Sequence, residues 1–511
     1  MENTAILHQL AHTLSAGELR YLQMNKSHEG ESLNAALLDI LLKMERPDNE
    51  QLAIKWRLYN KRKPFTLKSL ENTKSRLKDR LLEAINHNNL FILGGEIEKG
   101  LYTAEAYLQH HLPSEAIRCL MHAYEEHHEI MSPMYKVQLL QKLLVLLPLI
   151  KLENHSRQRT TYYNALRSAI QEEALFHEIY CLYLQVTNLY MENTIVKTDI
   201  RKKQLSEIAG HPLMGLATDT LAHIPTAYLL KTRGMVLQMQ NDLKGLIQNQ
   251  YTLCLALQKF KDHYTNTGRN INYLQEHINL GVLYAQTANI ADLPNALNPI
   301  RESIKNKPHY HEMFNAQMLF VEALCHYFSG DIDVLRPALK KCDSALRKTM
   351  SKLPPTLSEG FRYGLMKCWL ACGEHEMVDM WFMERSTDKP FVKLDGYFVM
   401  YLIRLCSDYE KGKTDLQTKT YQLPNGFLKR ALQFTSLHTL SKTTLPLEYQ
   451  IHKTFLELAK AKSISAHQKL LQRLGEKLDG LAAKEHPYLE QFYRMFNLRK
   501  WIRDMDTRLS K

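Results

Sequence analysis

The sequence predicts an all-α fold, an α-solenoid of stacked antiparallel helical hairpins, and two observations favour it. The first is a pattern that recurs at intervals of roughly 40 to 48 residues between about residues 225 and 390, in which an apolar helix stops at a turn-forming residue and a second helix begins at once. The second is composition, because only 20 Gly and 17 Pro occur in 511 residues, which leaves few positions where helices break. Stacked hairpins need only their neighbours, so such an array can grow without one central core.

Residues 1–95 are expected to form a small, basic helical region. Leucines recur at helical spacing along residues 67–87, so that stretch is predicted to be one amphipathic helix. Gly94 and Gly95 form the clearest break in this part of the chain, and the first domain boundary is placed there.

Residues 96–225 are expected to form irregular helical hairpins. Ser114 follows a proline-containing turn and is predicted to be an N-cap. Ser132 and Pro133 are predicted to open the next helix, because proline is tolerated in a first turn. A long helix is expected over about 159–190.

Residues 226–390 contain the regular hairpins, and residues 391–511 are expected to form further hairpins closed by a terminal helix. That last helix carries Trp501 and ends in a polar turn. A polar cap of this kind shields the final apolar face of an open-ended array.

Several positions of the regular stretch have the residue types that let paired helices pack closely: Gly234, Gly281, Tyr284, Ala296, Pro308, Trp369, Gly373, Phe382 and Pro390. The most regular unit contains Leu280-Gly281-x-x-Tyr284, followed by Ala296 and Pro308. This pattern resembles tetratricopeptide repeats. The resemblance implies a right-handed solenoid, in which glycine permits close approach, the aromatic residue fills the groove and proline ends the second helix.

The resemblance has departures, since the period varies and the unit at Gly330-Asp331 lacks the closing proline. Over its whole length the chain is also similar to a group of tetratricopeptide-like proteins from Bacteroidota-type bacteria. The residues that carry this similarity run from Leu14 to Tyr21 and from Tyr488 to Ile502. The similarity implies a fold and no particular activity.

Compartment signals are few. The first residues lack the basic region and apolar stretch of a secretory signal. The most apolar window, 137–150, is shorter than the roughly 20 residues that a membrane helix needs. The eight cysteines stand singly in helical surroundings, which is typical of free core thiols rather than of a disulfide framework. The sequence therefore predicts a cytoplasmic protein.

The net charge of +12 is unevenly spread. Ten basic residues face only Glu71 and Asp79 in one segment: Lys55, Arg57, Lys61, Arg62, Lys63, Lys68, Lys74, Arg76, Lys78 and Arg80. Such a segment can neutralise phosphates of nucleic acid or meet an acidic protein partner. On the predicted helix, however, the cations are distributed around the leucine stripe, as they are on an ordinary solvated helix.

No catalytic constellation is evident. Cys368, Cys372 and His375 have a spacing that could place them on one helix face, but zinc needs a fourth ligand and Gly373 is expected to end that helix. Core cysteines are the preferred interpretation. The sequence contains no phosphate-binding loop, no dinucleotide-binding glycine motif and no nucleophile elbow. Neither a metal nor a cofactor is predicted.

The leading expectation is therefore a non-catalytic scaffold or adaptor that binds an unknown protein or peptide in its concave groove. The alternative is a nucleic-acid-associated regulator that uses the basic segment 55–80. No membrane partner is expected.

Overall fold

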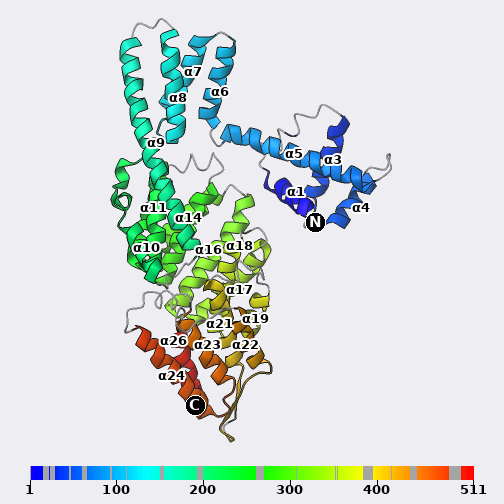
Figure 1. Ribbon diagram of the computed structural model, residues 1–511. Coiled ribbons are helices and arrows are strands. Elements are labelled where there is room, and N and C mark those ends of the chain that lie inside the picture. The colour runs from blue at the N-terminus through cyan, green and yellow to red at the C-terminus, as the bar shows by residue number, and fades with distance from the viewer. Residues whose placement is uncertain are drawn as a thin grey trace. The chain divides into compact units, whose positions relative to one another are not determined.

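The computed structural model describes residues 2–14, 22, 29–44, 48–59, 66–92, 95–110, 112–129, 131–149, 155–192, 199–259, 270–305, 308–350, 353, 355–383, 395–415, 417–437, 446–482 and 496–510. These residues are almost all helical, which confirms the all-α prediction (Figure 1). The chain divides into two compact units, Met1–Glu173 with Phe260–Asn270, and Ala174–Lys259 with Ile271–Lys511. The predicted boundaries near 95, 225 and 390 stay predictions.

Four described helices open unit 1 and share a core: α1 (Glu2–Thr13), α3 (Glu29–Leu42), α4 (Asn49–Tyr59) and α5 (Leu67–Ile92). The buried side of α4 contributes Leu52 and Trp56 to this core, and α5 contributes Leu70, Leu77 and Leu81. The predicted amphipathic helix is thereby confirmed, because its leucine stripe is the buried side of α5.

Unit 1 continues with α6 (Gly95–Gln109), α7 (Pro113–His127), α8 (Pro133–Leu146), the 3₁₀ turn η1 (Leu147–Leu149) and the first part of α9 (His155–Glu192). Helix α8 begins at Pro133 and the side chain of Ser132 accepts a hydrogen bond from the Tyr135 amide, which confirms that Ser132 and Pro133 open this helix. The N-cap predicted at Ser114 is wrong. Helix α7 begins at Pro113, two residues earlier than an N-cap at Ser114 implies, with Leu112 as its cap residue, because proline is favoured at the first helical position.

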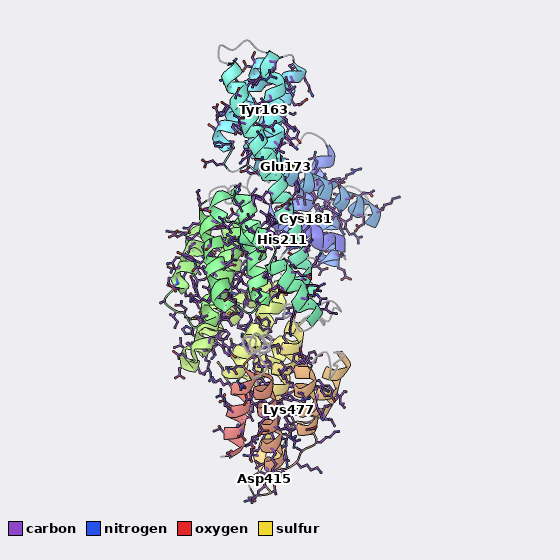
Figure 2. The ribbon with its side chains drawn as sticks, turned by 60° about the vertical axis from the view of Figure 1, so that its left-hand side comes forward. Tyr163, Glu173, Cys181, His211, Asp415 and Lys477 are labelled. Atoms are coloured by element: carbon purple, nitrogen blue, oxygen red, sulfur yellow. The ribbon has the colours of Figure 1, made fainter. Side chains whose placement is uncertain are left out.

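Helix α9 confirms the long helix predicted over 159–190 and is shared by the two units. In unit 1, Tyr162 is buried, and its ring meets Tyr124 edge-on at 5.8 Å. The next residue, Tyr163, is exposed (Figure 2).

Unit 2 contains the rest of α9 and the following elements: α10 (Asp199–Ala209), η2 (Pro212–Gly215), η3 (Thr218–Thr220), α11 (His223–Met239), α12 (Leu243–Gln258), α14 (Asn270–Gln286), α15 (Leu293–Ile304), α16 (Pro308–Ser329), α17 (Ile332–Thr349), α18 (Pro355–Ala371), α19 (His375–Met383), α21 (Asp395–Glu410), β1 (Lys413–Asp415), β2 (Thr420–Gln422), α22 (Phe427–Leu437), α23 (Pro446–Leu458), α24 (Ile464–Ala482) and α26 (Leu498–Ser510).

Four helices of unit 2 end in the same hydrogen-bonded turn. One or two residues after each helix, the chain has a positive φ, at Asn241 (66°), Ala288 (52°), Gly330 (77°) and Gly373 (72°). The next amide donates to a carbonyl five residues back: Asp242 to Leu237 (3.0 Å), Asn289 to Tyr284 (2.9 Å), Asp331 to His326 (3.2 Å) and Glu374 to Trp369 (3.0 Å). This geometry satisfies carbonyls at the helix end and reverses the chain. The turns predicted from Gly, Asn and Asp in this stretch are confirmed.

Consecutive helices pack as pairs, with α11 against α12, α16 against α17 and α18 against α19. Neighbouring pairs also touch, since α16 and α17 both contact α18 and α18 contacts α21. Gly281 marks one such close approach, because a Cβ there would lie 3.1 Å from Val321 of α16 and 3.3 Å from Leu297 of α15.

The end of unit 2 departs from pure helix at one short antiparallel hairpin, in which Lys413 pairs with Gln422. Asp415 lies at the turn of this hairpin (Figure 2), where its carboxylate accepts from the Gln417 amide at 2.9 Å. The terminal helix α26 packs on α24 and buries Trp501. In the part of the chain that the structure describes, no helix has the length and apolar character needed to cross a membrane.

Candidate functional site

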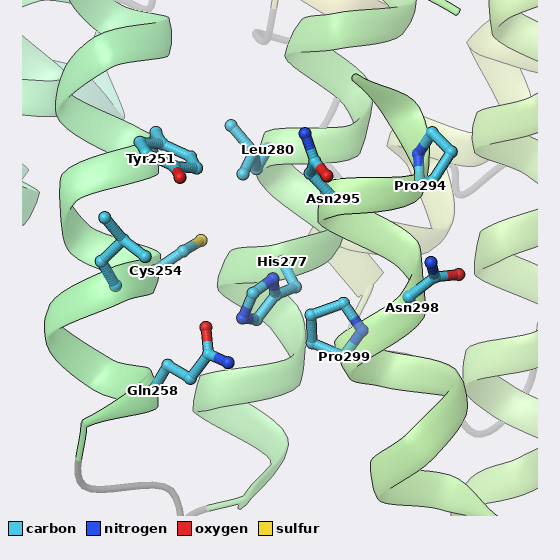
Figure 3. Close-up of a pocket in the computed structure, with 10 residues that line it drawn as sticks. Tyr251, Cys254, Gln258, His277, Leu280, Pro294, Asn295, Asn298 and Pro299 are labelled. Atoms are coloured by element: carbon cyan, nitrogen blue, oxygen red, sulfur yellow. The ribbon is translucent and has the colours of Figure 1, made fainter. Parts of the chain in front are cut away.

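A pocket of about 280 Å³ opens in unit 2 between α12, α14 and α15 (Figure 3). Its ten lining residues come from three helices: Tyr251, Cys254, Leu255 and Gln258 from α12, His277 and Leu280 from α14, and Pro294, Asn295, Asn298 and Pro299 from α15. None of these side chains carries a formal charge at neutral pH except through the imidazole of His277. The pocket therefore combines apolar walls with a few uncharged polar groups.

His277 lies deepest among the polar lining residues, with only 2% of its surface exposed. Its ring points from α14 into the space between α12 and α15 (Figure 3). Neither ring nitrogen has a partner in hydrogen-bonding geometry. Burial lowers the pKa of His277 to about 4, and the nearby backbone of Ala296 offsets only part of that lowering. The imidazole is neutral at pH 7, so it presents one donor and one acceptor.

Cys254 forms part of the wall and is not activated as a nucleophile. Its thiol donates to the backbone carbonyl of Glu276 at 3.5 Å. Burial raises the pKa of the Cys254 thiol, and the carboxylate of Glu276 raises it further. Because only the thiolate is a strong nucleophile, this cysteine contributes shape rather than reactivity.

Glu276 also orders the helix behind the pocket. Its carboxylate forms an ion pair with Lys231 at 2.8 Å and accepts from the Gln250 amide at 2.9 Å. Gln250 donates in addition to the Glu276 carbonyl at 3.0 Å. These contacts from α11 and α12 fix the turn of α14 that carries His277.

The rim of the pocket carries amide groups. Asn295 donates to Asp292 at 3.2 Å, and the Asn298 carbonyl oxygen accepts from Arg301 at 2.9 Å. Both asparagines are exposed and lie one helical turn apart on α15. Since a carboxamide has two N–H donors and two acceptor lone pairs, each retains capacity for a ligand.

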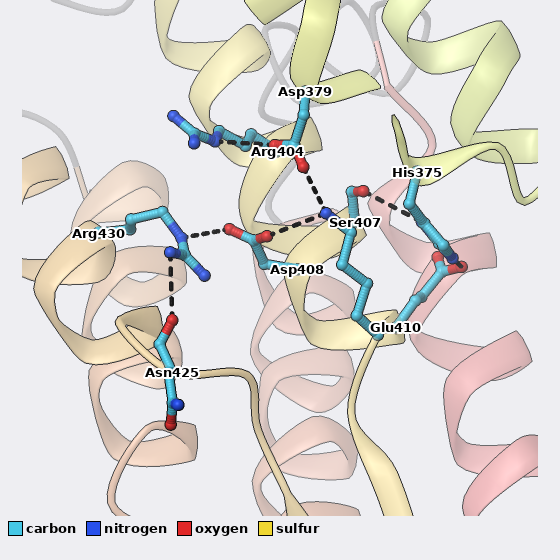
Figure 4. A network of polar contacts seen from close by, with 9 residues as sticks. His375, Asp379, Arg404, Ser407, Asp408, Glu410, Asn425 and Arg430 are labelled. Atoms are coloured by element: carbon cyan, nitrogen blue, oxygen red, sulfur yellow. Dashed lines mark hydrogen bonds and ion pairs between the residues drawn. The ribbon is translucent and has the colours of Figure 1, made fainter. Parts of the chain in front are cut away.

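A polar network joins α19, α21 and α22 at a second place in unit 2 (Figure 4). Asp379 pairs with Arg404 at 3.3 Å and with Lys411 at 2.5 Å. Asp408, whose side chain is 4% exposed, pairs with Lys411 at 3.5 Å and with Arg430 at 2.5 Å. Each buried or half-buried carboxylate thus faces two cations, as burial of charge requires.

His375 connects this network to the terminal helix. Its Nδ1 lies 3.1 Å from the Ser407 hydroxyl, and its Nε2 lies 3.8 Å from Glu410 (Figure 4). Glu410 in turn accepts a hydrogen bond from the indole of Trp501 at 2.7 Å. A hydroxyl, an imidazole and a carboxylate in a row resemble a nucleophile with its base. Ser407 has no exposed surface, and the group links α19, α21 and α26.

The structure distributes the cations of segment 55–80 over several environments. Lys55, Arg57, Lys68 and Arg76 are exposed, Lys78 and Arg80 are half-buried, and Lys61, Arg62 and Lys63 lie outside the described residues. Lys74 is buried, pairs with Glu71 at 2.7 Å and donates to Asn49 at 3.3 Å. Lys74 therefore ties α5 to α4 and is not available to a surface partner.

The cysteine and histidine motif does not form a cluster. Cys368 and Cys372 are buried, and burial raises the pKa of both thiols, whereas His375 faces Ser407 on α21. Among the described residues, no group of three or more His, Cys, Asp or Glu side chains is arranged to bind a metal.

Most of the expected packing positions lie in helix contacts. Tyr284, Ala296, Trp369 and Phe382 are buried, and a Cβ at Gly234 would lie 3.2 Å from Asn249. Pro308, expected to close a helix, is instead the first residue of α16, a position that suits its fixed φ. Pro390 lies outside the described residues.

Comparison of the chain with protein-family models, with curated proteins and with solved structures finds no match. The pocket and the network therefore rest on their own geometry. Sequence reasoning missed both. The local signal at His277 is slight, since a single histidine on the apolar side of a helix usually indicates an ordinary core position.

Proposed function

We propose that this chain is a tetratricopeptide-like, right-handed α-solenoid that acts as a non-catalytic scaffold and binds a protein or peptide partner. The observation that carries the proposal is the identical turn after α11, α14, α16 and α18, each with a positive φ followed by the same five-residue hydrogen bond. A turn repeated at similar intervals is what stacked copies of one hairpin require.

The pocket supports partner binding at a particular place. It lies where two second helices, α12 and α15, flank a first helix, α14, so it belongs to two neighbouring hairpins. Repeat arrays usually hold an extended partner in the concave groove formed by first helices. The pocket supplies a further, smaller contact between hairpins, with amides at its rim that match the donors and acceptors of a peptide.

A second candidate is nucleic-acid binding through unit 1. The observation that favours it is the exposure of Lys55 and Arg57 on α4 together with Lys68 and Arg76 on α5. Exposed cations bind phosphates in a manner that weakens steeply with salt.

Affinity capture of the tagged full chain from its host lysate, with and without nuclease, separates the two candidates. The scaffold proposal expects a defined protein partner that is recovered equally after nuclease treatment. Recovery of DNA or RNA, with loss of every protein partner after nuclease, would contradict the scaffold proposal and favour the second candidate.

A further inference from the structure

The floor of the pocket has a polar group whose bonding capacity is unused. His277 is 2% exposed, neither ring nitrogen has a partner in full hydrogen-bonding geometry although the backbone of Ala296 lies near the ring, and Figure 3 shows the ring directed between α12 and α15. Such an arrangement costs stability, since a buried polar group without a hydrogen bond loses its contacts with water and gains none. A ligand that reaches the ring would recover that loss.

Charge excludes one large class of ligands. No carboxylate, ammonium or guanidinium group is among the ten residues that line the pocket, and the low pKa of His277 keeps its ring neutral. A charged ligand group that entered the pocket would therefore lose its hydration and meet no opposite charge, which is costly in an apolar site.

Hydrogen-bonding capacity narrows the choice among uncharged groups. A neutral imidazole offers one donor and one acceptor, and a single hydroxyl matches it with one contact. A carboxamide inserted to the same depth would bring two N–H donors and a carbonyl beside Leu280 and Pro299, where some of them would stay unpaired.

The size and shape of the walls indicate what the hydroxyl is attached to. The cavity of about 280 Å³ is walled by Cys254, Leu280 and Pro299, so a short aliphatic alcohol would leave unfilled space. A flat aromatic ring would fill more of this space and bury apolar area against the walls. We propose that the pocket binds an aromatic alcohol, with the ring between α12 and α15 and the phenolic hydroxyl on His277.

Two sources can supply this chemistry, the tyrosine side chain of a peptide partner or a free phenol. The inference deepens the proposed function and rests on it for the peptide source, because a scaffold that holds a partner needs pockets for the side chains of that partner. Asn295 and Asn298 at the rim would then bind the peptide backbone on either side of the tyrosine.

The test uses the full chain with histidine rings labelled for NMR and p-cresol as the probe. We expect saturable binding that moves the ring signals of His277 and leaves those of His452, whose Nε2 lies 3.1 Å from the Ala431 carbonyl outside the pocket. Toluene, which lacks the hydroxyl, should bind at least tenfold more weakly, and 4-methylbenzoate should not bind. Equal affinity for p-cresol and toluene, tighter binding of 4-methylbenzoate, or no movement of the His277 signals would overturn the proposal.

Two variants and one control place the effect at the pocket. His277→Leu should remove the preference for p-cresol over toluene. Leu255→Trp, at a rim position that is 48% exposed, should block p-cresol, whereas Leu184→Trp, 43% exposed on α9 and not part of the lining, should leave its affinity unchanged. Should His277→Leu not fold, the two tryptophan variants decide, because equal affinity in both would overturn the proposal.

Blocked tripeptides identify the source. Tighter binding of acetyl-Gly-Tyr-Gly-amide than of p-cresol would support a partner tyrosine, and the reverse order would support a free phenol. Equal binding of the tyrosine peptide and its phenylalanine counterpart would rule out a partner tyrosine as the source. If p-cresol also bound no more tightly than toluene, the whole inference would be overturned. If p-cresol does not bind but a protein partner is still captured from the lysate, aromatic alcohols are ruled out as the ligand and the scaffold proposal stands.

Discussion

At the scale of single residues, two buried titratable groups in unit 2 make stability depend on pH in opposite directions. Burial raises the pKa of Glu410 to about 7, although the Trp501 indole and Arg508 favour its charged form. Burial lowers the pKa of His277 to about 4. Between its folded and its unfolded pKa, each group is neutral in the folded chain and charged in the unfolded chain. The free energy of unfolding therefore depends on pH over that interval.

Glu410→Gln tests the first group. A raised folded pKa contributes stability that is full below about 4.5 and is lost as pH rises through about 7. The variant should therefore be more stable than wild type at pH 8, by a margin on the order of 3 kcal/mol, and equal to it at pH 4.5. Chemical denaturation at the two pH values measures the margin, with Glu476→Gln, at an exposed position on α24, as the control. The same stability difference between variant and wild type at both pH values would contradict the raised pKa of Glu410.

His277→Leu tests the second group. A depressed folded pKa contributes stability that is present above about 6.5 and is lost as pH falls through about 4. Since leucine removes a buried polar group without a partner, the variant should gain about 1–3 kcal/mol at pH 7, and its advantage should widen towards pH 4. The free energy of unfolding from urea denaturation measures both effects. A loss of stability at pH 7 would mean that the histidine has a satisfied structural role.

At the scale of helices, the distance to the neighbouring helix should decide whether replacing a glycine by alanine lowers or raises stability. Two glycines of α18 form a matched pair. A Cβ at Gly364 would clash with the ring of Phe320, which already packs edge-on against Phe361 at 4.7 Å, whereas a Cβ at Gly360 would meet nothing within 4 Å. Gly364→Ala should thus destabilise the chain by about 1–3 kcal/mol. Gly360→Ala should stabilise it by about 0.5–1 kcal/mol. Thermal unfolding compares them, and shifts of equal sign would contradict the packing of α16 against α18.

The basic segment gives a second prediction at this scale. Lys61→Glu, Arg62→Glu and Lys63→Glu combined should leave protein capture intact if the scaffold proposal is correct, because the pocket lies in unit 2. The nucleic-acid alternative expects affinity for DNA or RNA to collapse in this triple variant and to fall steeply with salt in wild type. Filter binding over a salt series measures this. Full affinity in the variant would remove the segment from consideration.

Local sequence was informative about helix ends and uninformative about which helices meet. Turns at Asn241, Gly330 and Gly373 could be predicted because a positive φ favours Gly and Asn. Lys74 falls on the leucine stripe of the helical wheel, four residues after Leu70 and three before Leu77, so its burial follows from the wheel, whereas its partner Asn49 belongs to another helix and could not be predicted. Only tertiary pairing decides such contacts.

At the scale of the whole molecule, the same limit explains why the candidate site was missed. Cys254, His277 and Asn298 come from three helices, and the pocket exists only once two hairpins are stacked. Repeat periodicity predicts that hairpins stack, but it does not indicate which side chains meet between them. The all-α class followed from composition and turns, whereas the site depended on the packing of specific neighbours.

The central claim is that this array of hairpins binds a partner through the face that carries the pocket. The most direct test of this claim is to quantify how much partner the double variant Asn295→Ala/Asn298→Ala captures. The matched control is Gln185→Ala/Asn188→Ala, which removes two exposed amides at the same spacing on α9. The account predicts that the first double variant loses most of the partner while its helical circular dichroism is unchanged, and that the control retains it. Equal capture by both variants would contradict the claim.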